Sequence, residues 1–431
     1  MIGSILAALR IPDLKKRIFF VFAMFAVYVV GLHIPVPGVD ASAMSKLFGQ
    51  GGASNLFDLL NTFTGGAFKK FTIFAMGITP YINASIIMQL LTIAIPSLEQ
   101  LAKEGESGRK KIGQYTRWLT GALAFFQAVG MNIWLRNAGA LPQEVGFVSI
   151  PFWQIVITLT AGTAFLMYLG ELISDQGIGN GVSLIIFVGI VASLPTDIAR
   201  TYMVVKERGA WGAAILLIII FLATVAGIVA ITMAQRKIPI MHVKRVVGRK
   251  VYGGQSSELP IKVNSAGVIP IIFAVSIQYF PSTVAQFIPA GKFSNWFRVA
   301  AQWVSPGAGV PGMLFYAGLI IFFTYFYTAV VWNVNDIADN LKKWGSFIPG
   351  IRPGRPTVEY LDRVMTRLTL SGAVFLAIIA LMQYIVPGVT GITTFSLVGG
   401  TSLLIVVGVA LDTMQAIESQ LLMRHYEGFI K

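Results

Sequence analysis

Long apolar stretches recur along the whole chain, and polar residues gather in the segments between them. A membrane-spanning helix needs about 20 mainly apolar residues, and ten stretches approach this length with few acidic or basic residues. The pattern therefore predicts ten transmembrane helices. They fall at residues 18–34, 72–95, 116–135, 152–170, 182–198, 211–233, 265–289, 312–334, 368–387 and 392–411.

The fifth of these stretches has the shortest apolar core. Only 14 residues run from Val182 to Pro195, so this helix must borrow amphipathic residues beyond the proline. Short or interrupted spans often mark the pathway of a transported molecule.

Composition supports a membrane protein. The 431 residues are 55% hydrophobic and only 12% charged, whereas soluble domains are about 25% charged. The chain contains no cysteine, which excludes disulfides and cysteine-ligated metals.

Basic residues are unevenly divided between the two sides of the membrane. With a cytoplasmic N-terminus, the cytoplasmic segments hold 24 of the 33 Lys and Arg residues. Because basic loops remain in the cytoplasm, both termini are predicted to be cytoplasmic. Two large basic loops, 235–262 and 335–367, then face the cytoplasm, and their Pro and Gly residues indicate ordered protrusions. Basic residues next to a span are explained by their effect on membrane topology. Those in these two loops that lie far from any span are poorly explained by it.

The long loop at 35–70 is predicted to lie on the opposite side. It contains an amphipathic piece, SNLFDLLNTFTGG, that two glycines close. One interpretation is a surface helix over the mouth of a pore. The other is a short re-entrant segment that enters a cavity.

The second span, which contains GITPYINASIIMQ, is unusually polar. On a helix, Ile78, Ile82, Ser85 and Gln89 share one face. Small and polar residues of this kind commonly hold membrane helices together. Alternatively, this face lines a channel, because apolar constrictions can close a pore by excluding water. The two interpretations remain open on local evidence.

The apolar cores contain almost no ionisable residue. Asp412, Glu171, Asp175 and His33 fall at the ends of spans. Because ion-coupled carriers hold charges inside the bilayer, a proton- or sodium-coupled transporter is disfavoured. The three histidines lack metal-site spacing, and no nucleotide-binding loop is present. The glycines of DQGIGNGVS follow a membrane helix, so we expect a tight turn with close backbone approach.

Seven separated motifs, in the same order over essentially the whole chain, closely resemble the SecY family. Members of this family form the central subunit of the bacterial protein-conducting channel. The motifs are GITPYINASIIMQLL, EGESGRKKIGQYTR, DQGIGNGVS, VNSAGVIPIIFA, DIADNLKKWGSFIPGIRPG, DRVMTRLTL and GGTSLLIVVGVALD.

The resemblance implies an all-α integral membrane protein of ten transmembrane helices. Two inverted five-helix halves, residues 1–200 and 201–431, would surround a central hourglass pore with a re-entrant plug helix. The implied activity is passive translocation of unfolded preproteins across the bacterial inner (cytoplasmic) membrane. Signal sequences and membrane helices would leave sideways into the lipid.

Matching the motifs residue by residue gives candidate positions for each part of the channel. The pore ring would be Ile78, Ile82, Val182, Ile186, Ile272 and Ile405. The plug, about 54–67, would be Ser54, Asn55, Leu56, Phe57, Asp58, Leu59, Leu60, Asn61, Thr62, Phe63, Thr64, Gly65, Gly66 and Ala67. The polar residues of the lateral gate would be Gln89, Gln127 and Asn264, and the docking residues would be Arg249, Lys250 and Arg352.

The family also implies partners for the channel. These are the SecE and SecG subunits, the SecA ATPase, the ribosome, the preprotein with its signal peptide, and membrane lipid. SecA or the translating ribosome would supply the driving force, so neither catalytic residues nor a cofactor or metal are expected.

Two functions of other classes compete with a passive protein-conducting channel. One is a small-molecule secondary transporter, which the missing intramembrane charges disfavour. The other is an assembly scaffold or insertase that never forms an aqueous pore.

Overall fold

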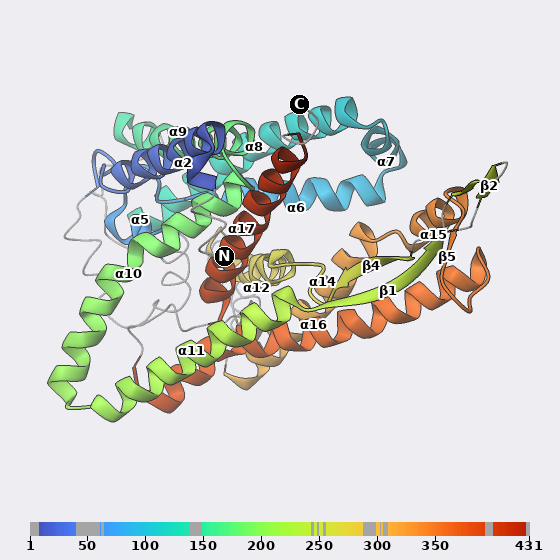
Figure 1. Ribbon diagram of the computed structural model, residues 1–431. Helices are drawn as coiled ribbons and strands as arrows, with labels where there is room; N and C mark the ends of the chain where they lie inside the picture. Colours follow the sequence, from blue (N-terminus) through green and yellow to red (C-terminus); the bar gives the residue numbers. More distant parts are fainter. Residues whose placement is uncertain are drawn as a thin grey trace.

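The computed structural model describes residues 8–39, 61, 64–137, 149–242, 245–247, 250–252, 256–287, 299–301, 303–304, 309–392 and 400–427. Helices form most of this part of the chain (Figure 1). The first helices are α2 (Pro12–Gly31), α5 (Ala67–Lys70), α6 (Thr79–Ala94), α7 (Pro96–Lys103), α8 (Glu106–Asn137), α9 (Ile150–Gln176) and α10 (Gly181–Arg208). The later helices are α11 (Trp211–Met233), α12 (Ile269–Phe287), α14 (Val310–Val331), α15 (Val334–Lys343), α16 (Arg355–Thr390) and α17 (Thr401–Glu427).

Seven helices in the described ranges are long and apolar enough to cross a membrane, namely α8, α9, α10, α11, α14, α16 and α17. The pair α6–α7, bent by 100°, adds an eighth if it is one span. The bend falls at Ile95, which is extended because it precedes Pro96. The other two predicted spans overlap α2 and α12. Each of the ten predicted spans therefore overlaps a helix, and the chain is a multi-pass membrane protein.

Three helix boundaries sharpen or correct the predictions. Helix α10 continues past Pro195 to Arg208, so the fifth span does borrow residues beyond its proline. Helix α17 begins at Thr401 and passes through Asp412, so this carboxylate lies within the helix rather than after it. Helix α16 begins at Arg355, inside the predicted loop 335–367, because apolar residues at helical spacing continue its buried face outside the membrane stretch.

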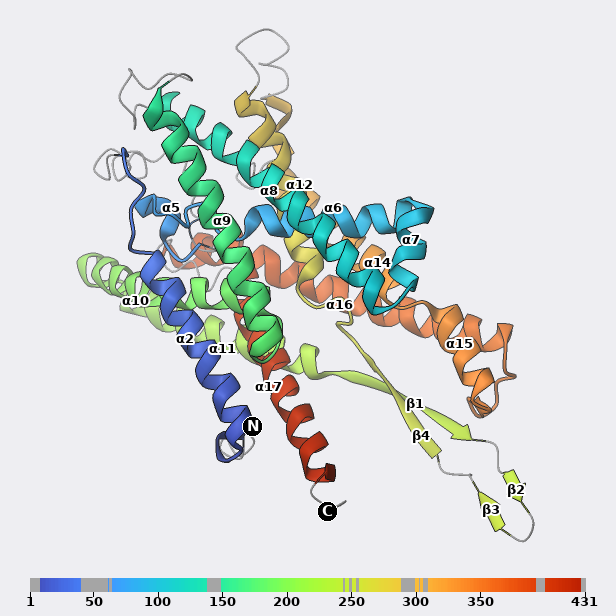
Figure 2. The same cartoon turned by 90° about the horizontal axis from the view of Figure 1, so that it is seen from above.

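The two large basic loops, 235–262 and 335–367, contain strands that an all-α prediction did not include. A three-stranded antiparallel sheet has the order β4-β1-β5, and a two-stranded sheet pairs β2 with β3. The strands are β1 (Gln235–His242), β2 (Arg245–Val247), β3 (Lys250–Tyr252), β4 (Ser256–Lys262) and β5 (Ser346–Phe347). Figure 2 shows β1 and β4 extending away from the helices. The predicted ordered protrusions are confirmed, and β5 joins the two loops.

One large hydrophobic cluster draws residues from most of the long helices. Helix α10 packs against both α11 and α17, and so connects the first five spans to the last five. By contrast, α11 exposes Ile215, Ile218 and Leu222. In a multi-pass membrane protein, such exposed aliphatic residues suit contact with lipid tails.

Candidate pore and lateral gate

A pocket of about 310 Å³ lies where helices of the two halves of the chain meet. Helices α6, α9, α10 and α12 form most of its wall, and α8 contributes one residue. The lining residues are Tyr81, Ile82, Ser85, Ile86, Gln89, Arg117, Glu171, Ser174, Asp175, Asn180, Val182, Ser183, Ile186, Ile269, Ile272 and Phe273.

Four of the six predicted ring residues line this pocket. They are Ile82 on α6, Val182 and Ile186 on α10, and Ile272 on α12. All four side chains are β-branched and apolar. In the sequence, helix α11 and the strands β1 to β4 lie between α10 and α12. The fold therefore brings these four residues together, since they are not close in the sequence.

The other two predicted ring residues are buried beside the pocket rather than in its lining. Ile78 and Ile405 are 6% and 2% exposed and belong to the hydrophobic cluster that also contains Ile186. Both side chains are therefore packed among apolar neighbours. Their participation in a ring stays a prediction.

The pocket changes character along its length. On α6, Gln89 lies seven residues beyond Ile82, which is about 10 Å at 1.5 Å per residue. On α10, Asn180 caps the helix and Ile186 follows one and a half turns later. The polar lining thus belongs to the end where α6 finishes and α10 begins, and the apolar lining lies deeper.

Pro80 begins α6 instead of interrupting it. Thr79 is the first helical residue, so Pro80 occupies the first turn, where a backbone N–H has no intrahelical acceptor. The N–H groups of Tyr81 and Ile82 both bond to the carbonyl oxygen of Ile78 at 3.1 Å. Pro80 therefore removes no intrahelical hydrogen bond, and it fixes the start of the helix.

The DQGIGNGVS segment positions the first turn of α10 against α9. A Cβ atom on Gly181 would overlap the carbonyl oxygen of Gly170, so only glycine fits this approach. The Ser174 hydroxyl accepts a hydrogen bond from the Gly181 N–H at 2.9 Å. Asn180 caps the helix by accepting from the Ser183 N–H at 3.2 Å. The predicted tight turn with close backbone approach is confirmed, and it places Val182 at the pocket.

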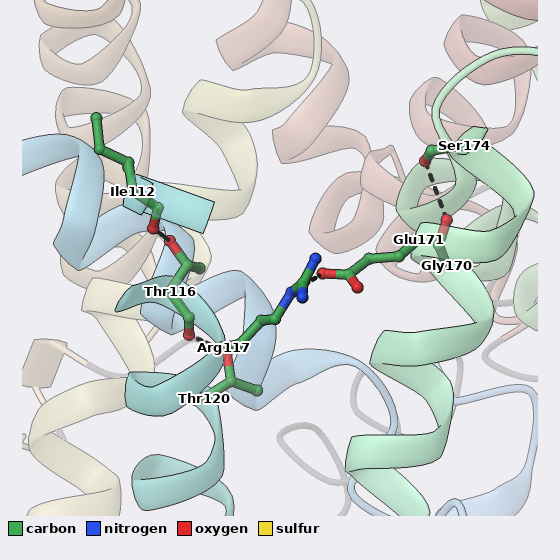
Figure 3. A network of polar contacts seen from close by, with 7 residues as sticks. All are labelled: Ile112, Thr116, Arg117, Thr120, Gly170, Glu171 and Ser174. Atoms are coloured by element: carbon green, nitrogen blue, oxygen red, sulfur yellow. Dashed lines mark hydrogen bonds and ion pairs between the residues drawn. The ribbon is translucent and has the colours of Figure 1, made fainter. Parts of the chain in front are cut away.

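An ion pair joins α8 to α9 at the polar end of the pocket (Figure 3). The Nε atom of Arg117 donates to Oε1 of Glu171 at 2.6 Å. Both side chains line the pocket, and that of Glu171 is the less exposed of the two. Glu171 is thus paired with Arg117, and Asp175 is the other acidic residue of the lining.

The described end of the predicted plug is anchored inside the helical bundle. The Asn61 carbonyl oxygen accepts from the Gly66 N–H at 2.8 Å, and its side-chain oxygen accepts from the Lys69 N–H at 2.9 Å. The Tyr28 hydroxyl of α2 donates to the Thr64 carbonyl at 3.4 Å. A Cβ atom on Gly65, whose φ is +66°, would lie 2.7 Å from a backbone oxygen of α10. The rest of the plug, residues 54–60, 62 and 63, lies outside the described residues.

Of the three predicted gate residues, Gln89 is the one that lines the pocket. Its side chain also interacts with that of Tyr327 on α14, so the contact crosses from the second span to the eighth. Asn264 is buried ahead of α12, and its Oδ1 has no partner within the described ranges. Gln127 is half-buried on α8.

The predicted docking residues belong to the two large basic loops. Lys250 begins β3, and Arg352 is exposed in the turn between β5 and α16. The Arg352 carbonyl oxygen accepts from the Thr357 hydroxyl at 2.9 Å, which fixes the backbone of this turn to α16. Arg249 lies outside the described residues.

Sequence reasoning missed two residues that contribute to the site. Tyr327 belongs to a run of aromatic residues that is typical of a lipid-facing helix, although its side chain interacts with Gln89. Arg117 was counted only as a basic residue beside a span. The isolated acidic residue Glu171 could have indicated the role of Arg117, since a carboxylate at a span boundary favours a basic partner on a neighbouring helix.

The described part of the chain contains no group of three His, Asp or Glu residues that could hold a metal ion.

The fold and the site together define a class: a polytopic helical membrane protein with a neutral, apolar-walled pocket between its two halves. The SecY family model matches residues 72–414. The translocase subunit SecY of Streptomyces scabiei is 44% identical over the full length of both chains, and that of Thermotoga maritima is 44% identical over 98% of this chain and 96% of its own. The chain therefore belongs to the SecY family.

Solved structures share this fold at lower sequence identity. One, described as "The structure of a protein conducting channel", has a TM-score of 0.65 and 20% identity, and covers 96% of each chain. Another is canine Sec61 in a ribosome-channel complex, with a TM-score of 0.59 and 18% identity over 96% of each chain. These likenesses establish the two-half helical fold.

Proposed function

We propose that this chain is the pore-forming subunit of a protein translocase. It passes unfolded preproteins across the cytoplasmic membrane of a bacterium and releases signal sequences and membrane helices into the lipid. The observation that carries the proposal is the group of four β-branched apolar residues, Ile82, Val182, Ile186 and Ile272, that helices of both halves bring to one pocket. Membership of the SecY family supports the same function.

An apolar constriction suits a polypeptide as cargo. A chain in transit presents a polar backbone and every kind of side chain, so a constriction rich in hydrogen-bonding groups would retain some segments. Aliphatic side chains make weak, non-directional contacts and adapt to each passing residue. When no chain is present, the same side chains exclude water and so oppose the leakage of ions.

The plug and the gate complete the proposed channel. The anchored end of the plug, Thr64–Ala67, sits against α2 and α10, so the residues before it are well placed to close the pore. The gate would open between α6 and α8 on one side and α12 and α14 on the other. The Gln89–Tyr327 contact crosses that line, and a pair of neutral side chains suits a boundary that must separate.

The basic loops are the proposed docking surface for the driving partners. Lys250 and Arg352, with Arg249, would contact the SecA ATPase and the translating ribosome, while SecE and SecG would complete the channel. A guanidinium pairs with carboxylates and with RNA phosphates, so one arginine can serve both partners. This arrangement requires both termini and both loops to be cytoplasmic.

Reconstitution tests the proposed function directly. Proteoliposomes containing this chain with SecE and SecG, supplied with SecA, ATP and a preprotein, should accumulate preprotein that external protease cannot digest. Liposomes without this chain provide the control. Complete digestion of the preprotein would contradict the proposal, and uptake of small solutes by the chain alone would favour a secondary transporter.

A further inference from the structure

The two cytoplasmic loops share a small hydrophobic core near the membrane. Ile238 of β1 and Ile261 of β4 pack with Ile348, Leu361 and Met365 from the loop after α14 and from α16. Apolar packing thus holds the two loops together along the first part of the β1–β4 hairpin. The outer part needs another kind of contact, because β1 extends about 23 Å from Gln235 to His242 at 3.3 Å per residue.

His242 occupies the point where that core ends. It follows Ile238 and Ile240 on the same face of β1, since side chains two residues apart share a face. Its register partner is Ser346 of β5. Ser257 of β4 is its diagonal neighbour on the other side, because Ser257 pairs with Ile240.

The imidazole bridges both neighbouring strands. Its Nδ1 atom lies 2.8 Å from the Ser346 hydroxyl, and its Nε2 atom lies 3.1 Å from the Ser257 hydroxyl. A serine hydroxyl can donate or accept, so each contact can form in either imidazole tautomer. Ser346 is only 3% exposed, so loss of His242 would leave its hydroxyl buried without this partner.

The strand that His242 holds is too short to stay paired by itself. Strand β5 has two residues and, within the described ranges, pairs with β1 alone, through Met241–Phe347 and His242–Ser346. Two-residue pairings are marginal without side-chain support. The chain then runs from β5 to the exposed Arg352, five residues after Phe347.

We infer that His242 is a positioning residue that joins the two basic loops into one docking platform. By fixing β5 to the hairpin, it holds Arg352 at a constant place relative to the β2–β3 tip that carries Lys250. A partner then meets one preorganised basic surface rather than two independent loops. This inference rests on the docking role proposed above.

The first test compares docking and local exchange in His242→Ala. The affinity of purified SecA for the reconstituted channel should fall roughly tenfold, the loss expected for one buried hydroxyl left unpaired. Hydrogen exchange of the backbone amides of β5 should accelerate. Unchanged exchange and unchanged affinity would overturn the inference.

Two conservative variants separate positioning from direct contact with the partner. The amide of Asn reaches the place of Nδ1, whereas that of Gln reaches the place of Nε2. His242→Asn should therefore keep the Ser346 contact and most of the affinity, and His242→Gln should behave like His242→Ala. Equal defects in the Asn and Ala variants would count against the inference.

A disulfide between β1 and β5 provides the most direct test of whether SecA affinity can be restored in His242→Ala. The chain has no cysteine, so Met241→Cys with Phe347→Cys introduces one defined thiol pair at a register position. In the His242→Ala background, oxidation of this pair should restore SecA affinity, and reduction should remove it. Failure of the oxidised, cross-linked protein to recover would contradict a positioning role.

Arg352→Glu distinguishes failure of the inference from failure of the proposed function. If Arg352→Glu abolishes SecA binding while His242→Ala has no effect, the docking surface stands and the inference fails. If Arg352→Glu binds SecA normally, the docking proposal fails. The exchange comparison then still reports whether His242 joins the loops.

Discussion

The pore wall and the platform formed by the two basic loops are held together in opposite ways. At the pore, Ile82, Val182 and Ile186 project from long helices packed on a single large cluster. On the platform, a two-residue strand is held by two backbone register pairs and the hydroxyl contacts of His242. The difference teaches that the proposed seal would depend on shape and apolarity, which tolerate substitution by similar residues, whereas the end of the proposed docking platform beyond the apolar core would depend on a few polar contacts.

The largest effect is expected from substitutions in the pore wall. Changing Ile82 and Ile186 together to Ser places hydroxyls in the pocket wall and should admit water, because an apolar constriction closes by dewetting. Ion conductance of the reconstituted channel in planar bilayers should rise clearly while translocation persists.

The matched control makes the same two changes on a lipid-facing helix. Ile215 and Ile218 of α11 are exposed, and their replacement by Ser should leave conductance at the level of the unmodified channel. Equal conductance in the pore variant and the control would refute the assignment of Ile82 and Ile186 to the seal.

A smaller effect is expected where the helices of the pore wall meet. Gly181→Ala puts a Cβ atom against the carbonyl oxygen of Gly170 and should lower the free energy of unfolding by about 1–3 kcal/mol, as overpacking does. Thermal unfolding in detergent measures this loss. Gly212→Ala, where no described heavy atom lies within 4 Å of the new Cβ, should cost nothing, and an equal loss in both variants would show that the contact is unimportant.

The smallest effect is expected for the ion pair at the polar end of the pocket. A double-mutant cycle on Arg117→Ala and Glu171→Ala should give a coupling energy below about 1 kcal/mol, because both side chains are partly exposed to solvent. Raising the salt concentration should reduce it further. A coupling of several kcal/mol would instead mark Arg117 and Glu171 as a buried structural pair.

The helices were predictable because their signal is local. Each apolar stretch of span length overlaps a helix in the described ranges, and the glycine spacing of DQGIGNGVS predicted its tight turn. The start of α6 at Thr79 could not be predicted, because the apolar stretch begins earlier, at residue 72, in turns that precede the helix.

The strands and the polar partners were not predictable for the opposite reason. The pairing of β5 with β1 joins residues more than one hundred positions apart, and nothing local to Ser346 indicates a strand. Likewise, the Gln89–Tyr327 and Arg117–Glu171 contacts arise only when separate helices come together. Polar pairs between distant residues can be predicted only when the fold is known, whereas membrane spans can be predicted from local composition.

The central claim is that a polypeptide passes between the two halves at the level of the apolar ring. A photoreactive residue placed at Ile82 or Ile272 tests it, with Ile215 and Ile218 of α11 as lipid-facing controls, in channels that hold a stalled preprotein. The account predicts adducts to the preprotein from Ile82 and Ile272 and none from the α11 positions. Adducts confined to Ile215 and Ile218 would contradict it.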